Sequence, residues 1–375
     1  MSYRKFNIIT IDLEALRHNF LSLLSLLSPK CKGIMAVVKS DAYGHGLIEV
    51  SRLLVKEGAK YLGISEVEEA AKIREAGITT PILLLSGIAL GAEKDVFYYD
   101  LIPGVGDISS LDALEETAKF YNVKKDIHVK VDTGMGRLGF SVADAKKIFL
   151  TRDKWPHLNF SGLYTHLSAS DEPDDPFTKW QLEKFLRLID FLKNKKLLPP
   201  IIHMANSGGV INFPETHFDI VRPGVALYGA YPGEASKDKI KLKPVMSFKS
   251  RIISIHKRDA NSPVSYGHTY YTKRISKIAV VPVGYDDGYL RALSNKAKVL
   301  VKGKLCPVVG RICMKALMVD VTDIDGVCVN DEVVLLGRQL DNEISIEMLA
   351  NWANTISYEI MCLIGTRNQR IFKGA

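Results

Sequence analysis

The sequence predicts an α/β protein, with a (β/α)8 TIM barrel over residues 1–240 and a mainly β C-terminal domain over residues 241–375. Eight short apolar runs alternate with amphipathic segments before residue 231, a pattern typical of a parallel barrel. A polar, lysine-rich stretch then begins at Tyr231, and beyond it short strands alternate with turn signals. The length of 375 residues accommodates two domains at roughly 150 residues each.

The first predicted element is a helix with Thr10 as its candidate N-cap, and Pro29 ends its apolar pattern. Eight strands follow, and their apolar runs are continuous, as expected for a parallel sheet that is covered on both faces. They are 34–38, 61–64, 82–85, 100–102, 127–131, 160–164, 201–203 and 219–221. Helices are predicted between them over 66–76, 111–121 and 177–193, whereas 86–99 contains two glycines and predicts only a poor helix.

The second domain is predicted from short strands separated by turns. The expected strands are 246–255, 277–283, 298–301, 317–321 and 332–336. Lys302-Gly303-Lys304 and Asp325-Gly326 are turn signals, and only the segment 345–355 has a helical pattern.

Composition excludes several classes of protein. The hydrophobic fraction is 47% and the charged fraction 25%, which is typical of a globular protein and unlike disordered, collagenous or coiled-coil chains. The start of the chain has no leader-like apolar stretch, and no run approaches the roughly 18 apolar residues of a membrane span. The five cysteines are scattered without a CxxC pair, so neither a disulfide framework nor a metal site is expected. These features predict a cytoplasmic protein that does not act at a membrane.

The net charge of +8 arises entirely after residue 240. Residues 1–240 contain 30 basic and 30 acidic side chains, and residues 241–375 contain 20 and 12. Such an excess fits a solvated surface, an anionic substrate or a nucleic acid. The segment lacks the interleaved aromatic and basic residues of nucleic-acid binders, so no nucleic-acid partner is expected.

Reactive side chains follow the predicted strands, where barrels carry their active sites. The residues at or just after strand ends are Lys39, Lys130, Arg137, His166, His203, Asn206, Ser207, Arg222 and Gly224. A lysine held among barrel strands loses water, which favours the neutral amine that a nucleophile needs. Asn206-Ser207 and Gly224-Val225 follow strands seven and eight, a common place for phosphate. A lysine with a phosphate site indicates pyridoxal 5′-phosphate, although barrels that bind sugar phosphates share these features.

Motifs along both domains resemble those of the alanine racemase family. They are AVVKSDAYGHG, KVDTGMGRLGF, GLYTHLSASD, HMANSGG, RPGVALYG, VSYGHTY, VPVGYDDGY, GRICM and ISYEIMC, in family order from residue 36 to 362. The resemblance implies an isomerase dependent on pyridoxal phosphate, a homodimer with composite active sites that interconverts L- and D-alanine. It also implies a role in supplying D-alanine for peptidoglycan.

The resemblance implies two catalytic bases, Lys39, which also binds the cofactor covalently, and Tyr266 from the partner subunit. Racemisation needs one base on each face of the substrate. An ordinary tyrosine has a pKa near 10, so Tyr266 requires a cationic environment, which His166, Arg222 and His203 would supply. Arg222 would also face the pyridine nitrogen and leave it unprotonated, which would limit side reactions.

The remaining implied residues bind the phosphate, bind the substrate or line an access corridor. Tyr43, Asn206, Ser207, Gly224, Val225 and Tyr358 match the cofactor positions; Arg137 and Met314 match the substrate-binding positions; Asp171, Tyr285, Arg291 and Arg311 match the corridor. Lys130 matches a lysine that is carbamylated in several members and would hold Arg137 in place.

One position departs from the pattern. The family usually has aspartate after the methionine of the CMD motif, whereas this chain has Cys313-Met314-Lys315. Lys315 thus places a positive charge where the family usually has a negative one, which is expected to change the hydrogen bonds of this loop and the position of the substrate beside it.

Three alternatives remain from the residues. A decarboxylase of basic amino acids could use the same barrel, but it would place a carboxylate where this chain has Arg222. A non-catalytic pyridoxal-phosphate-binding protein would consist of the barrel alone. Within the racemase hypothesis, serine competes with alanine as substrate.

Overall fold

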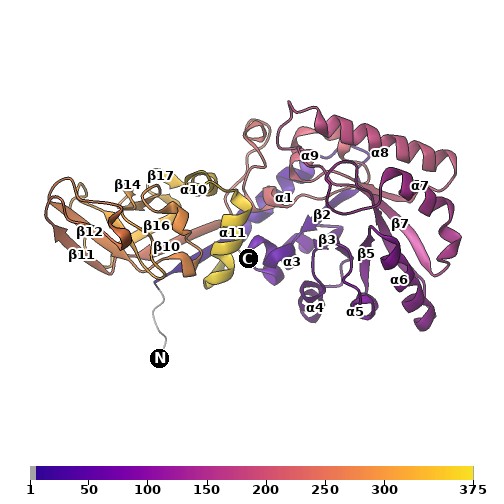
Figure 1. Cartoon of the computed structure of the whole chain (residues 1–375), viewed down its shortest axis with the longest axis horizontal. Helices are drawn as coiled ribbons and strands as arrows, with labels where there is room; N and C mark the ends of the chain where they lie inside the picture. The colour runs from indigo at the N-terminus through magenta and orange to yellow at the C-terminus, as the bar shows by residue number, and fades with distance from the viewer. Residues whose placement is uncertain (1–5, 375) are drawn as a thin grey trace. The chain divides into compact units, whose positions relative to one another are not determined.

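The computed structural model describes residues 6–374, which form two compact units (Figure 1). The barrel unit comprises residues 17–42 and 47–242, and the β unit comprises the described residues 6–16, 43–46 and 243–374. The division therefore falls at Leu242, close to the position expected from sequence, but the first described residues group with the C-terminal unit. Residues 1–5, which begin the segment searched for a leader, lie outside the described residues.

The barrel unit contains one parallel sheet of eight strands in the order β8-β7-β6-β5-β4-β3-β2-β9. The strands are β2 (Gly33–Val37), β3 (Tyr61–Ile64), β4 (Ile82–Leu84), β5 (Leu101–Val105), β6 (Lys125–Lys130), β7 (Leu158–Tyr164), β8 (Ile201–His203) and β9 (Ile220–Val221). Two backbone hydrogen bonds nearly close the ring, because the amide of Asp219 donates to Ile202 (2.9 Å) and that of Arg222 to Ala205 (2.8 Å). The predicted eight-stranded barrel is confirmed.

Helices cover the outside of this sheet (Figure 1). They are α1 (Leu13–Ser25), α3 (Leu47–Lys56), α4 (Val67–Glu75), α5 (Glu93–Tyr98), α6 (Ile108–Tyr121), α7 (Val142–Leu150), α8 (Phe177–Asn194) and the short α9 (Ser207–Asn212). The poor helix expected over 86–99 is α5, which is only six residues long. Strands such as β2 are buried along their whole length, which explains why their apolar runs are continuous.

The β unit contains two sheets. The larger has the order β14-β13-β16-β10-β1-β18, with β17 paired to β16, and the smaller has the order β11-β12-β15. Its strands are β1 (Ile8–Asp12), β10 (Met246–Arg251), β11 (Ser254–Arg258), β12 (Ser276–Val281), β13 (Lys298–Val301), β14 (Lys304–Pro307), β15 (Leu317–Asp320), β16 (Glu332–Gln339), β17 (Asn342–Ile344) and β18 (Arg370–Lys373). Helices α10 (Ile346–Ala353) and α11 (Ser357–Arg367) complete it.

The N-terminal assignment requires a correction. Thr10 is not a helix cap, because it lies in β1 and pairs with Ser247 of β10 and Ile371 of β18. The cap is Asp12, whose Oδ1 accepts from the amide of Ala15 (3.0 Å). The strand was missed because its partners lie more than 200 residues away in the sequence, and local periodicity cannot reveal pairing between such distant segments.

The C-terminal domain differs from expectation in two places. The predicted strand 246–255 is two strands, β10 and β11, which belong to different sheets. A second helix, α11, was not predicted, because its buried residues Ile360, Met361 and Ile364 form only a narrow stripe. Within residues 6–374, no helix has the length and apolar character needed to cross a membrane.

Candidate active site

The strand register aligns three polar side chains at the carboxyl ends of β6, β7 and β8. Lys130 pairs with Tyr164, and Tyr164 pairs with His203, so the three residues form one row across the sheet. Successive parallel strands share this edge, which is where barrel enzymes build their sites. The row therefore unites two predicted residues, Lys130 and His203, with Tyr164, which was not predicted.

Tyr164 lies at the centre of this row and is almost fully buried. Its ring stacks on His203 with centroids 4.7 Å apart, and the cationic groups of Lys130 and Arg222 lie 5.5 and 5.4 Å from its centroid. Its hydroxyl donates to the carbonyl of Leu85 (3.1 Å), which also accepts from Lys130 Nζ (3.1 Å). Tyr164 lies two residues after Gly162 on β7, so the two residues point to the same face of the sheet. This alternation is the sequence signal that could have identified Tyr164.

Arg222 is buried directly after β9 and donates to four acceptors. Its Nη1 contacts His203 Nδ1 (2.8 Å), and its Nη2 contacts the carbonyls of Thr165 (2.7 Å) and Met204 (3.1 Å) and His166 Nδ1 (3.3 Å). Burial lowers the pKa of Arg222 to about 10. The guanidinium is therefore still charged at neutral pH, and it can only donate.

The neighbouring imidazoles are neutral because burial, and then the charge of Arg222, lower their pKa values. The pKa of His128 is lowered to about 3, and those of His166 and His203 lie well below the ordinary value. Since His203 Nδ1 accepts from Arg222, its proton lies on Nε2, which donates to His128 Nδ1 (2.9 Å). Among Arg222 and these three histidines, the positive charge thus resides on Arg222, and His166 contributes a hydrogen bond only.

His128, which was not predicted, completes this chain inside the barrel. Its Nε2 is buried without a hydrogen-bond partner, and its ring fills space that only a glycine at position 162 leaves open. A Cβ at Gly162 would lie 2.2 Å from His128 Cγ. His128 and Lys130 lie two residues apart on β6, and this spacing is the signal that could have found His128.

Lys130 is buried among cations. Burial, and then the charges of Arg222, Arg137 and Lys39, lower its pKa to about 8 against the opposing effect of Asp132. A much larger fraction of Lys130 is therefore neutral at neutral pH than of an ordinary lysine. Carbamylation of Lys130 requires that neutral amine and stays a prediction.

The pKa of Lys130 predicts a pH-dependent stability. Between pH 8 and 10.5 the unfolded chain binds more protons at this lysine than the folded one, so the free energy of unfolding should rise with pH across this window. Replacing Lys130 with methionine should remove the increment, which is roughly 3 kcal/mol. Urea unfolding of both proteins from pH 7 to 10.5 in carbon-dioxide-free buffer measures it. Equal pH profiles for the two proteins would show that Lys130 has no such depressed pKa.

Lys39 stands at the end of β2 and begins a turn of unusual backbone. Ser40, Asp41 and Ala42 all have φ of 54–55°, and Tyr43 has φ 54°, so the chain makes one turn in the left-handed helical region. That conformation costs roughly 1–2 kcal/mol for each non-glycine residue. Asp41 stabilises the turn, because its Oδ1 accepts from the amide of Leu47 (2.8 Å). Strain of this kind concentrates at functional sites, and it directly follows the predicted cofactor lysine.

The loops after β8 and β9 meet at Ser207. Its Oγ accepts from the amides of Gly224 (2.9 Å) and Ala226 (3.2 Å). Asn206 caps α9, its Oδ1 accepting from the amide of Gly209 (3.0 Å). Val225 is fully buried beside them. The four residues predicted around the phosphate, Asn206, Ser207, Gly224 and Val225, are thus brought together.

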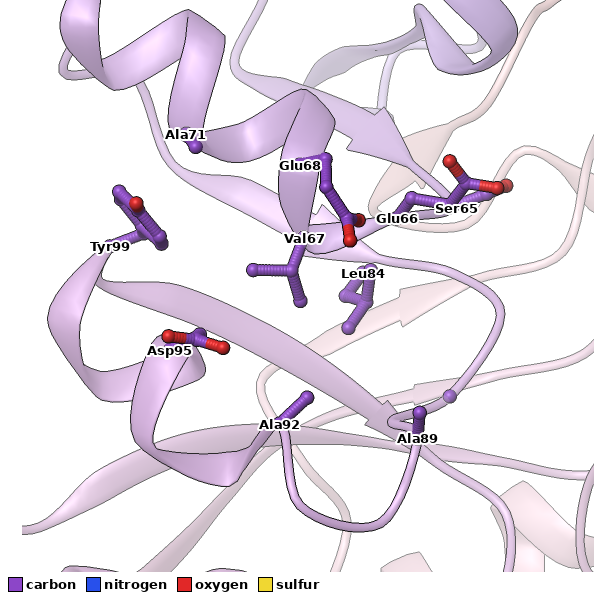
Figure 2. Close-up of a pocket in the computed structure, with 11 residues that line it drawn as sticks. Ser65, Glu66, Val67, Glu68, Ala71, Leu84, Ala89, Ala92, Asp95 and Tyr99 are labelled. Atoms are coloured by element: carbon purple, nitrogen blue, oxygen red, sulfur yellow. The ribbon is translucent and has the colours of Figure 1, made fainter.

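Two hollows lie in the barrel unit, and their charges differ. One, of about 420 Å³, is lined by two cations, Lys130 and Arg137, and by two acids, Asp107 and Asp132. The other, of about 320 Å³, lies between α4 and α5 and is lined by Glu66, Glu68 and Asp95 (Figure 2). The first hollow therefore offers cations beside its acids, whereas the charged residues of the second are all acids, which disfavours an anionic ligand there.

The other predicted residues lie outside this cluster. Asp171 is exposed in the loop before α8. The β unit contains Tyr43 and Tyr358, whose ring centroids are 6.0 Å apart, and also Tyr266, Tyr285, Arg291, Arg311 and Met314. Tyr266 is 72% exposed, and Ser265 before it donates to the carbonyl of Arg311 (2.6 Å).

Both units match models of one enzyme family. Residues 11–232 match the model described as alanine racemase, N-terminal domain, and residues 245–372 match alanine racemase, C-terminal domain. Together the two matches define a two-domain isomerase of amino acids.

Individual proteins support the same assignment. The alanine racemase of Halothermothrix orenii is 43% identical over 97% of this chain and 96% of its own length. The structure of a Clostridium difficile 630 alanine racemase superposes with a TM-score of 0.93 at 34% identity, covering 99% of this chain and 96% of that one. A Bartonella henselae alanine racemase with covalently bound pyridoxal phosphate has a TM-score of 0.89 at 30% identity, covering 98% of this chain and 100% of that one.

The chain belongs to the alanine racemase family. This confirms the resemblance, the fold class, the assignment as an enzyme and pyridoxal phosphate as the cofactor of the family. The roles of individual residues stay predictions.

Proposed function

We propose that this chain interconverts L- and D-alanine with pyridoxal phosphate and two bases, Lys39 and Tyr266. The observation that carries the proposal is the cationic cluster at the carboxyl ends of the barrel strands. The charges of Lys39, Arg137 and Arg222 all lower the pKa of Lys130, and the charge of Asp132 opposes them. Such a field favours a ligand that carries a phosphate and a carboxylate.

The residues present fit the cofactor in their donor chemistry. Lys39 offers the amine that would bind it covalently. Ser207 Oγ accepts from the amides of Gly224 and Ala226, and its hydroxyl proton would be donated to the phosphate. Tyr43 and Tyr358 would bind the same phosphate. When bound, pyridoxal phosphate supplies an electron sink that acidifies the α-hydrogen of the amino acid.

Arg222 would face the ring nitrogen of the cofactor. Because its pKa remains at about 10, the guanidinium donates a hydrogen bond there without giving up its proton. The neutral His203 behind it fixes the orientation of the guanidinium. This arrangement disfavours the decarboxylase alternative, which would need a carboxylate at this position.

The proton transfers require two bases on opposite faces of the substrate. Lys39 would hold or move the proton on one face, and Tyr266 of the partner subunit would do so on the other. Arg137 and the backbone of Met314 would bind the substrate carboxylate, and Asp171, Tyr285, Arg291 and Arg311 would line the path to it. Tyr266 is exposed within its own chain, which is consistent with a residue that completes a neighbour's site in a homodimer.

The proposed biological role is the supply of D-alanine for peptidoglycan in the cytoplasm. This role rests on the resemblance to the alanine racemase family.

A screen by chiral chromatography tests the substrate and the reaction together. The purified protein, loaded with pyridoxal phosphate, is incubated with single enantiomers of the common amino acids. We expect alanine to racemise fastest. Faster racemisation of serine than of alanine would show that the proposed substrate is wrong. Release of carbon dioxide from a basic amino acid would show that the protein is a decarboxylase and that the proposed reaction is wrong.

A further inference from the structure

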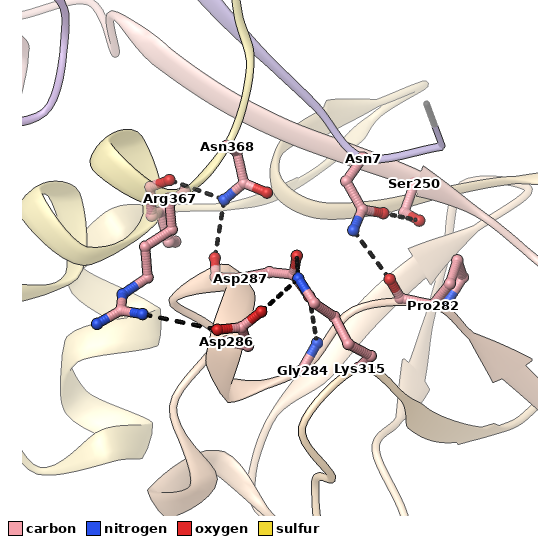
Figure 3. Close-up of polar contacts among 10 residues, drawn as sticks. Asn7, Ser250, Pro282, Gly284, Asp286, Asp287, Lys315, Arg367 and Asn368 are labelled. Atoms are coloured by element: carbon pink, nitrogen blue, oxygen red, sulfur yellow. Dashed lines mark hydrogen bonds and ion pairs between the residues drawn. The ribbon is translucent and has the colours of Figure 1, made fainter. Parts of the chain in front are cut away.

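Lys315, where this chain departs from the CMD motif of its family, lies between two aspartates. Its Nζ is 2.7 Å from Asp286 Oδ2 and 2.8 Å from Asp287 Oδ1 (Figure 3). The aspartates belong to the turn 284–288, and Lys315 belongs to the turn 313–316, so one side chain joins loops 28 residues apart. The inverted charge is thus matched by acids that face it.

The backbones of the two turns also pack directly on one another. The amides of Tyr285 and Asp286 donate to the carbonyls of Cys313 and Met314, both at 3.1 Å. Gly284 permits this approach, because a Cβ there would lie 2.1 Å from the carbonyl oxygen of Cys313. The Lys315 side chain links the same two turns through its ammonium group.

The three charged partners are in different environments. Lys315 and Asp286 are about half exposed, with side-chain exposures of 57% and 48%, whereas that of Asp287 is 6%. Asp287 also accepts from the amide of Gly284 (3.0 Å), and its carbonyl accepts from Asn368 Nδ2 (2.8 Å) at the end of α11. Removing the ammonium would leave a buried carboxylate with one fewer partner, and the turn around it would loosen.

The loops that Lys315 joins carry two of the predicted functional residues. Met314 is 58% exposed and Tyr285 39% exposed, so side-chain packing alone does not fix either of them. We propose that Lys315 is a positioning residue, which clamps the turns 284–288 and 313–316 and thereby sets the Met314 backbone and the Tyr285 side chain for the amino-acid substrate. The role of Lys315 toward the substrate rests on the proposed function, whereas its link between the two turns does not.

Amide hydrogen exchange and steady-state kinetics of the holoenzyme test the two parts separately. In Lys315→Met, which keeps the apolar stem, the amides of Tyr285 and Asp286 should exchange faster. KM for L-alanine should rise roughly fivefold, because exposed ion pairs of this kind contribute little each, and kcat should stay within about twofold. Lys315→Arg keeps the cation and should restore both the protection and KM.

Lys249→Met is the matched control. Lys249 forms a similar half-exposed pair with Glu332 (3.1 Å) in the same unit, and this pair includes no residue of either turn. Its loss should therefore change neither the exchange of the Tyr285 and Asp286 amides nor KM. Unchanged exchange at Tyr285 and Asp286 in Lys315→Met would overturn the clamp. Faster exchange with unchanged KM would overturn the positioning role. A wild-type protein that does not racemise alanine would instead refute the proposed function, and exchange would still report the clamp.

Discussion

Lys39→Ala should abolish racemisation and covalent binding of pyridoxal phosphate. Lys39 is both the proposed attachment point and one of the two bases, so the rate of alanine racemisation should fall by at least about 10³-fold, near the upper range for loss of one acid–base group. The left-handed turn that follows Lys39 is a backbone conformation of residues 40–43, and replacing the Lys39 side chain with a methyl group leaves those residues unchanged. The variant should therefore fold, and its circular dichroism should match that of the wild type.

Two readouts check this result. Chiral chromatography measures turnover, and the visible absorbance that remains after denaturation and gel filtration measures covalent cofactor. Lys147→Ala is a suitable control, because Lys147 is an exposed lysine of the same unit that lies on α7 and pairs with Asp144. A Lys39→Ala protein that racemises alanine at the native rate would disprove the role of Lys39.

Tyr266→Phe should slow racemisation by about 10²- to 10⁴-fold. Because the two enantiomers have equal free energy, kcat/KM must fall equally in both directions, and the asymmetry should appear in solvent-isotope exchange. A base that serves one face exchanges the α-hydrogen of only one enantiomer with solvent. Loss of the phenol should therefore suppress solvent-deuterium incorporation for one enantiomer more strongly than for the other. Because Tyr266 is 72% exposed, the substitution removes one hydroxyl without disturbing a core.

Mass spectrometry of alanine recovered from deuterated buffer measures this asymmetry. Tyr271→Phe, at a half-exposed tyrosine of the same unit, is the matched control and should behave like the wild type. Full activity with equal exchange of both enantiomers would exclude Tyr266 as a specific base. Complementation provides a further check: mixing Lys39→Ala and Tyr266→Phe subunits should regain activity only if the sites are composite.

The sequence predicted much of the barrel, because most residues of each strand are buried and strands such as β2 and β4 are buried throughout, which leaves an apolar run. It also predicted the cations at the strand ends, since the end of a run such as 34–38 can be read directly and Lys39 follows it. Elements of the β unit were predicted less well. Strand β1 pairs with β10 and β18, and such long-range pairings leave no local pattern.

The sequence by itself determined the fold class and the family, and it singled out Lys39 as the candidate cofactor lysine, because these depend on local periodicity and on motifs. Only the tertiary structure decided how the polar groups share protons and charge. The register that aligns Lys130, Tyr164 and His203, the neutral state of the histidines around Arg222, and the two aspartates that receive Lys315 all depend on contacts between distant segments. Burial and charge at those contacts set the pKa values, and neither is encoded at any one position of the chain.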